Sequence, residues 1–166
     1  MQTSRLHGWL RMNDNAPHMH TTQNLSHQEA QRIVHAIQTE LEARGKTAVI
    51  AVCDAHGELL SFLRVSGAPL PSILIAQNKA FTAARERRPS KDIGQASRHV
   101  TDGFSLSNFG DPRYIGWGGG VPVWIEGACV GAVGVSGLPE SEDIELAQIG
   151  VNALTAGLEG SGTNLG

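Results

Sequence analysis

Residues 118–150, GGGVPVWIEGACVGAVGVSGLPESEDIELAQIG, carry the clearest succession of strand and helix patterns in the chain. Residues 121–126 and 128–135 are short apolar runs on either side of Gly127, and this arrangement predicts a β-hairpin. Pro122 cannot donate a hydrogen bond to a neighbouring strand, so its strand is expected to lie at a sheet edge or to begin there. The segment therefore predicts two antiparallel strands.

The second strand of this hairpin leads into a helix. Acidic residues fill the expected first turn, where the positive end of the helix dipole favours them: Glu140, Glu142 and Asp143. Apolar residues then recur at helical spacing up to Leu154. The strand itself carries three small residues, which predict that a helix or a ligand packs closely on it: Gly131, Ala132 and Gly134.

The part of the chain that precedes this segment also predicts helices and a hairpin. Residues 26–45 begin with a Ser-x-x-Glu capping box and end at a glycine, which predicts a helix. Residues 48–53 and 58–64 predict a second hairpin, in which Asp54 and His56 are interpreted as turn residues rather than a catalytic pair. Prolines bound another predicted helix, before a weak helical pattern at 92–99. Strands that arrive as hairpins predict an antiparallel α+β domain.

The composition favours a single soluble domain that binds a small molecule or copies of itself. The 166 residues are 40% hydrophobic with a net charge of -3, which provides no basic footprint for nucleic acid. No apolar run is long enough for a membrane span, and we expect a cytoplasmic protein. Residues 1–24 are expected to form a flexible tail, residues 25–158 the domain and residues 159–166 a frayed end. Cys53 and Cys129 are interpreted as buried, reduced thiols.

The loop before the first glycine of the opening segment is the main candidate for ligand contact. Its glycines precede a strand rather than a helix, which argues against a phosphate-binding loop. Arg113 offers a planar fork for a carboxylate, while Tyr114 and Trp117 offer faces for a flat ring. The alternative is an ordinary loop whose aromatic side chains cover the core. Lys79, among alanines of the second helix, is interpreted as a lysine that reaches past the buried face into solvent.

Three blocks of this sequence resemble the GlcG/HbpS family of small haem-binding or haem-degrading-type proteins. They are VIAVCDAHGELLSFLRVSGAP at 49–69, SILIAQNKAFTAA at 72–84, and the opening segment. The resemblance covers about residues 25–158. It implies a profilin-like or roadblock-like fold, in which helices flank a central antiparallel sheet of about five strands, and assembly into homo-oligomers from dimers to octamers.

The resemblance also implies where a ligand lies. It favours Lys79 as a functional residue and these residues as ligand contacts: Arg64, Arg113, Trp117, Gly119 and Gly120. The first functional hypothesis is a non-enzymatic protein that binds haem or another tetrapyrrole. Two histidines are candidates for an axial ligand, and the first is our metal-site candidate: His27 and His99.

Two other functions remain open at this point. Some relatives resemble cofactor-independent lyases that release ammonia from a hydroxylaminobenzoate. In such an enzyme Arg113 or Lys79 would bind the carboxylate, Tyr114 and Trp117 would hold the ring, and an acid would protonate the departing hydroxyl, with these candidates: Glu142 and Asp143. The third hypothesis is an accessory subunit of a glycolate-type oxidation system, without chemistry of its own.

Overall fold

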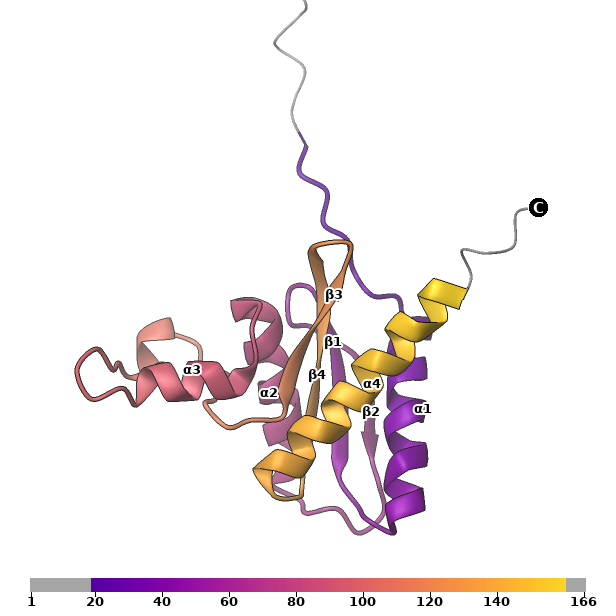
Figure 1. Cartoon of the computed structure of the whole chain (residues 1–166). Coiled ribbons are helices and arrows are strands. Elements are labelled where there is room, and N and C mark those ends of the chain that lie inside the picture. Colours follow the sequence, from indigo (N-terminus) through magenta and orange to yellow (C-terminus); the bar gives the residue numbers. More distant parts are fainter. Residues whose placement is uncertain (1–18, 161–166) are drawn as a thin grey trace, which may run out of the picture.

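The structure is a computed structural model and describes residues 19–160. Four strands form one sheet, and four α-helices complete an α+β fold in which helices cover both faces of the sheet (Figure 1). The predicted tail is described only from residue 19, and residues 161–166 lie outside the described part of the chain. The elements, in chain order, are α1 His27–Arg44, β1 Val49–Asp54, β2 Leu59–Arg64, α2 Ser72–Glu86, α3 Ser90–Ser97, the 3₁₀ turn η1 Leu106–Phe109, β3 Gly120–Ile125, β4 Ala128–Ser136 and α4 Glu140–Gly160.

The sheet has the order β2-β1-β4-β3, and every neighbouring pair is antiparallel. Both predicted hairpins are present, and Pro122 lies in the edge strand β3, as expected. The prediction of about five strands is wrong for the described residues, which form four. The resemblance alone implied a fifth strand, and the apolar runs of this sequence account for only four.

Local chemistry sets the helix boundaries. The Ser26 hydroxyl accepts a hydrogen bond from the Glu29 amide at 3.3 Å, and the Glu29 carboxylate accepts from the Ser26 amide at 2.7 Å. This is the predicted capping box, and Gly45 ends α1 in a left-handed conformation with φ 62°. In the turn between β1 and β2, the Asp54 carboxylate accepts hydrogen bonds from the backbone amides of His56 and Glu58, which confirms its role as a turn residue.

The core lies on both faces of the sheet. Helices α1 and α4 cover one face with the larger cluster of aliphatic side chains, while α2 covers the other face through a row of alanines. Gly134 explains the close approach of α2, because a Cβ there would lie 2.0 Å from the Ala76 carbonyl oxygen. Helix α2, not a ligand, therefore occupies the space beside Gly134, whereas Gly131 lies against the Leu25 side chain and the Cys53 carbonyl of β1.

The segment between α2 and β3 stands apart from these layers. Helix α3 and its following loop project beside α2, away from α1 and α4 (Figure 1). The chain then returns through residues 110–119 to the edge strand β3. Within the described part of the chain, no helix combines the length and apolar character that crossing a membrane requires. The returning loop brings the aromatic and glycine residues of the sequence next to α2 and α4.

Candidate functional site

A cavity of about 480 Å³ opens between α2, the β4–α4 connection and the loop before β3, and we call it the α2–α4 cavity. Several residues that the sequence singled out meet here from distant parts of the chain. Lys79 comes from α2, Trp117 from the glycine-rich loop and Asp143 from the first turn of α4. The other lining residues are Pro69, Ser72, Ile75, Gly118, Ser136, Gly137, Leu138 and Glu140.

A buried ion pair forms the inner wall of this cavity. Lys79 is only 3% exposed and Asp143 only 2%, and the Lys79 Nζ lies 2.8 Å from the Asp143 Oδ2. Lys79 also donates to the Val135 carbonyl at 2.9 Å, while the Leu138 amide donates to the other Asp143 oxygen at 3.1 Å. The interpretation of Lys79 as solvent-reaching is therefore wrong, because its partner is a carboxylate from α4, far away in sequence.

The environment of Asp143 acts on its pKa in both directions. Burial disfavours the charged carboxylate and raises its pKa, whereas the hydrogen bond and charge of Lys79 lower it. Burial has the larger effect, so the pKa of Asp143 lies above its ordinary value. The carboxylate therefore depends on Lys79 for its charge to be tolerated.

Two glycines let the loop pass directly against this pair. A Cβ on Gly119, which has φ 118°, would lie 2.5 Å from the Val135 oxygen and 2.9 Å from the Lys79 Nζ. On Gly120, a Cβ would lie 2.2 Å from the Lys79 carbonyl oxygen. Both glycines are buried, so their observed contacts are with the protein's own α2 and β4.

The mouth of the cavity carries an aromatic ring and a carboxylate. Trp117 is 57% exposed, and its carbonyl accepts from the Ser90 hydroxyl at 2.7 Å, which fixes the backbone beneath the indole. The Gly118 amide donates to the Glu140 Oε2 at 3.0 Å. The other Glu140 oxygen lies 3.7 Å from the Lys91 Nζ, with both side chains 44% exposed.

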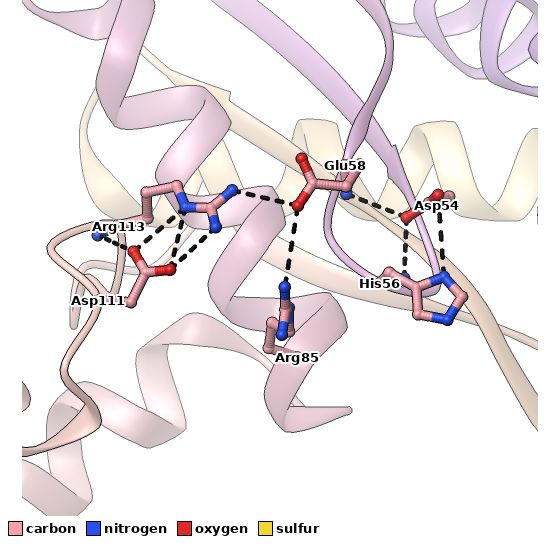
Figure 2. Close-up of polar contacts among 6 residues, drawn as sticks. All are labelled: Asp54, His56, Glu58, Arg85, Asp111 and Arg113. Atoms are coloured by element: carbon pink, nitrogen blue, oxygen red, sulfur yellow. Dashed lines mark hydrogen bonds and ion pairs between the residues drawn. The ribbon is translucent and has the colours of Figure 1, made fainter.

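Arg113 lies outside this cavity and is already engaged with two carboxylates (Figure 2). Its guanidinium contacts Asp111 at 2.9 Å and Glu58 at 3.3 Å, and it lies over the Phe81 ring, 3.9 Å from the centroid. The hydrogen bonds from Arg113 hold the pKa of Asp111 below its ordinary value. This contact set ties the loop to α2 and to the β1–β2 turn.

Tyr114 belongs to an aromatic cluster rather than to the cavity. Its ring stacks on Phe109 with centroids 4.0 Å apart and an interplanar angle of 7°, and it meets the edge of Phe81 at 5.4 Å. Partial burial raises the pKa of its phenol. The structure thus separates Trp117, at the cavity mouth, from Arg113 and Tyr114, which hold the loop together.

The remaining predicted site residues lie elsewhere. Glu142 forms an ion pair with Lys46, away from the cavity lining. Arg64 is exposed at the end of β2, and His27 is exposed at the start of α1. His99 lines a separate open hollow beside Phe104, where its Nδ1 accepts weakly from two backbone amides.

A second hollow, which sequence reasoning missed, lies between residues 20–23, the end of α2 and the β3–β4 turn. We call this hollow of about 360 Å³ the N-terminal groove, and four of its lining side chains have chemical interest: His20, Arg87, Trp124 and Cys129. Trp124 faces Cys129 across the two strands and is 45% exposed. The available signal was the period of the two strands, which places both side chains on one face.

The two cysteines differ in environment. Cys53 is buried in β1, as predicted, and burial raises the pKa of its thiol to about 12. Cys129 is only partly buried, so the prediction of a buried thiol is wrong there, because it lies near the open end of the hairpin. Burial still raises its pKa, and the charge of Arg87 partly opposes that shift.

The two hollows differ in their fitness for an iron-containing ligand. Haem iron is held in proteins by His, Cys, Met or Tyr side chains. None of the described residues that line the α2–α4 cavity is of these types, whereas His20 and Cys129 both line the N-terminal groove. Among residues 19–160, no cluster of three or more His, Cys, Asp or Glu side chains is arranged for a bare metal ion.

Comparison with known proteins identifies relatives over most of the chain. Residues 25–152 match the family model described as haem degrading protein HbpS-like. Protein GlcG of Escherichia coli K12 is 36% identical over 118 residues, which are 71% of this chain and 85% of GlcG. The corrinoid adenosyltransferase PduO of Citrobacter freundii is 27% identical over 131 residues, 79% of this chain but only 39% of PduO.

Solved structures agree with this assignment. The protein ORFY of Klebsiella pneumoniae superposes with a TM-score of 0.80 and 28% identity, over 85% of this chain and 97% of ORFY. A PduOC:haem complex superposes with a TM-score of 0.73 over 78% of this chain and 94% of PduOC, and at 24% identity it supports the fold. From the family match and the similarity to GlcG, the chain belongs to the HbpS-like family.

Proposed function

We propose that the protein binds haem or a related tetrapyrrole, and that the N-terminal groove holds it. The observation that carries the placement is the meeting of His20, Cys129, Arg87 and Trp124 in one hollow. The family description and the haem complex of PduOC support the class of ligand. The α2–α4 cavity offers no side chain of an iron-ligating type, which favours the groove.

The groove residues have distinct roles in this proposal. His20 would hold the iron through an imidazole nitrogen, and we favour it over Cys129 because burial raises the pKa of that thiol and so disfavours the thiolate. Arg87 would pair with a propionate, and Trp124 would offer a ring face to the flat macrocycle. Bound haem supplies a redox-active iron with a Soret absorption band that reports its axial ligand.

Titration of the purified protein with hemin, followed by the Soret band, tests the proposal. We expect a saturable shift in wild type and a weakening of at least about tenfold in His20→Ala, the loss of about one strong contact. The matched control is His27→Ala, which removes an exposed histidine outside the groove. No saturable shift in wild type contradicts haem binding, and unchanged affinity in His20→Ala contradicts the groove as its site.

The lyase hypothesis draws less support from the site. It needs a free cation for the substrate carboxylate, but Arg113 pairs with Asp111 and Glu58, and Lys79 pairs with Asp143. Of its two candidate acids, Asp143 lines the cavity and Glu142 does not. The role of accessory subunit stays a prediction, which co-purification with a partner would test.

We also propose that copies of the chain associate through β2 and α2. Leu59 and Phe62 pair with β1 residues that lie under α2, yet both side chains are exposed. Leu74 of α2 is exposed as well and lines the same small hollow as Leu59. Exposed apolar groups that adjoin one another favour an interface.

The native mass of the assembly in solution tests this interface. It should fall in Leu74→Asp and stay unchanged in Val100→Asp, which alters a fully exposed side chain outside β2 and α2.

A further inference from the structure

The α2–α4 cavity has a charge balance that the sequence did not reveal. Its lining contains one lysine and two carboxylates. Lys79 and Asp143 neutralise each other inside the wall, at 2.8 Å and almost without exposure. The charge left for a ligand is therefore the carboxylate of Glu140 at the mouth.

Glu140 is held in place but only weakly neutralised. The Gly118 amide donates to its Oε2 at 3.0 Å, which fixes the carboxylate beside the glycine-rich loop. Lys91 lies 3.7 Å from the other oxygen, and both side chains are 44% exposed. Exposed ion pairs of this kind contribute little to stability, so a cation with better geometry can replace Lys91.

The indole of Trp117 completes the recognition surface. It is 57% exposed, and its own carbonyl and the next amide are fixed by Ser90 and Glu140. An exposed aromatic face attracts cations as well as flat rings. A carboxylate beside such a face is the arrangement that recognises a flat cation.

The N-terminus of α4 does not reverse this preference. A helix N-terminus attracts anions, but the first turn of α4 already carries the carboxylates of Glu140, Glu142 and Asp143. The Leu138 amide is taken by Asp143. An anionic ligand would therefore meet the carboxylate of Glu140, and the one lysine in the cavity lining, Lys79, is already paired with Asp143.

We propose that the α2–α4 cavity is a second binding site, selective for a planar organic cation such as an amidinium or guanidinium attached to a flat ring. The cationic fork pairs with Glu140 and the ring lies against Trp117. This site is separate from the N-terminal groove and does not depend on haem binding.

Benzamidine, benzamide and benzoate are matched probes, because they share a ring and differ in the charge of a planar substituent. In isothermal titration calorimetry at neutral pH, we expect benzamidine to bind wild type at least about tenfold more tightly than benzoate, with benzamide between them. Glu140→Gln should remove the preference for benzamidine, whereas Lys91→Gln should keep or strengthen it. Trp117→Ala should weaken the binding of benzamidine.

The fold of each variant is checked by circular dichroism and by its urea unfolding midpoint. Benzoate that binds as tightly as benzamidine, or a preference that survives Glu140→Gln, overturns the proposal. Absence of saturable benzamidine binding to wild type overturns it as well. Each of these results leaves the hemin titration unaffected, so a failure here is distinct from a failure of the proposed function.

Discussion

The α2–α4 cavity and the N-terminal groove handle charge in opposite ways. In the cavity, Lys79 is buried and its charge is cancelled by Asp143, which leaves the carboxylate of Glu140 to meet a ligand. In the groove, Arg87 is exposed at the end of α2, where a partner from solvent can reach it. A cation in a hollow is therefore available to an anionic ligand only if the fold has not already paired it with a carboxylate.

We expect the largest loss of stability from a substitution that breaks the buried ion pair of Lys79 and Asp143. Lys79→Met leaves Asp143 charged and unpaired, and loss of one partner of a buried ion pair costs about 3–5 kcal/mol. Urea unfolding of the variant measures this loss. The double variant Lys79→Met/Asp143→Leu should recover much of the stability, since no charge stays buried. A loss well below about 1 kcal/mol in the single variant would mean that the pair is exposed in solution.

The same variant should make stability depend on pH. Without Lys79, the pKa of Asp143 in the folded protein rises further above its unfolded value, because burial then acts alone. A raised folded pKa means that the folded state holds its proton more tightly, so stability is retained at low pH and lost as pH rises through the folded pKa. The deficit relative to wild type should therefore be smaller at pH 4 than at pH 8. An equal deficit at both values would show that Asp143 does not cause it.

We expect Arg87, the cation of the groove, to affect ligand binding rather than stability, in contrast to Lys79. Arg87→Gln removes an exposed charge, so the urea midpoint should stay close to that of wild type. Hemin should bind several-fold more weakly, and the effect should shrink at high salt because exposed charges are screened. Hemin titrations at low and high salt measure this. A large loss of stability with unchanged hemin affinity would give Arg87 a structural role instead.

The smallest effect is expected for Arg113, which lies in neither hollow. Arg113→Ala removes a partly exposed contact set with Asp111 and Glu58, and exposed pairs of this kind contribute little. Hemin and benzamidine should bind as in wild type. A marked loss of either ligand would restore Arg113 as a ligand contact and weaken the contrast between the two hollows.

Much of the fold follows from local sequence patterns. The capping box at Ser26 and the two apolar pairs of strands predicted the helix and hairpins that the structure contains. The sequence predicted close packing on Gly134 but not whether a helix or a ligand packs there, because the partner, α2, lies far away in the chain. Local signals therefore located the elements, while their packing decided what each small residue is for.

The candidate sites were harder to predict, because their chemistry depends on partners far apart in sequence. Lys79 lies among alanines, and only the fold brings Asp143 to it. Arg113 and Trp117 are four positions apart in one loop, yet Arg113 turns to Asp111 and Glu58 while Trp117 reaches the cavity mouth. Cys129 lies in an apolar strand, but its place near the end of the hairpin leaves it partly exposed.

Titration of two ligands into two variants tests the central contrast most directly. Hemin and benzamidine are each added to wild type, His20→Ala and Glu140→Gln. We expect His20→Ala to weaken the binding of hemin alone and Glu140→Gln to weaken the binding of benzamidine alone, each by at least about tenfold. Either variant weakening both ligands to the same extent, or hemin affinity that depends on Glu140 and not on His20, would contradict this expectation.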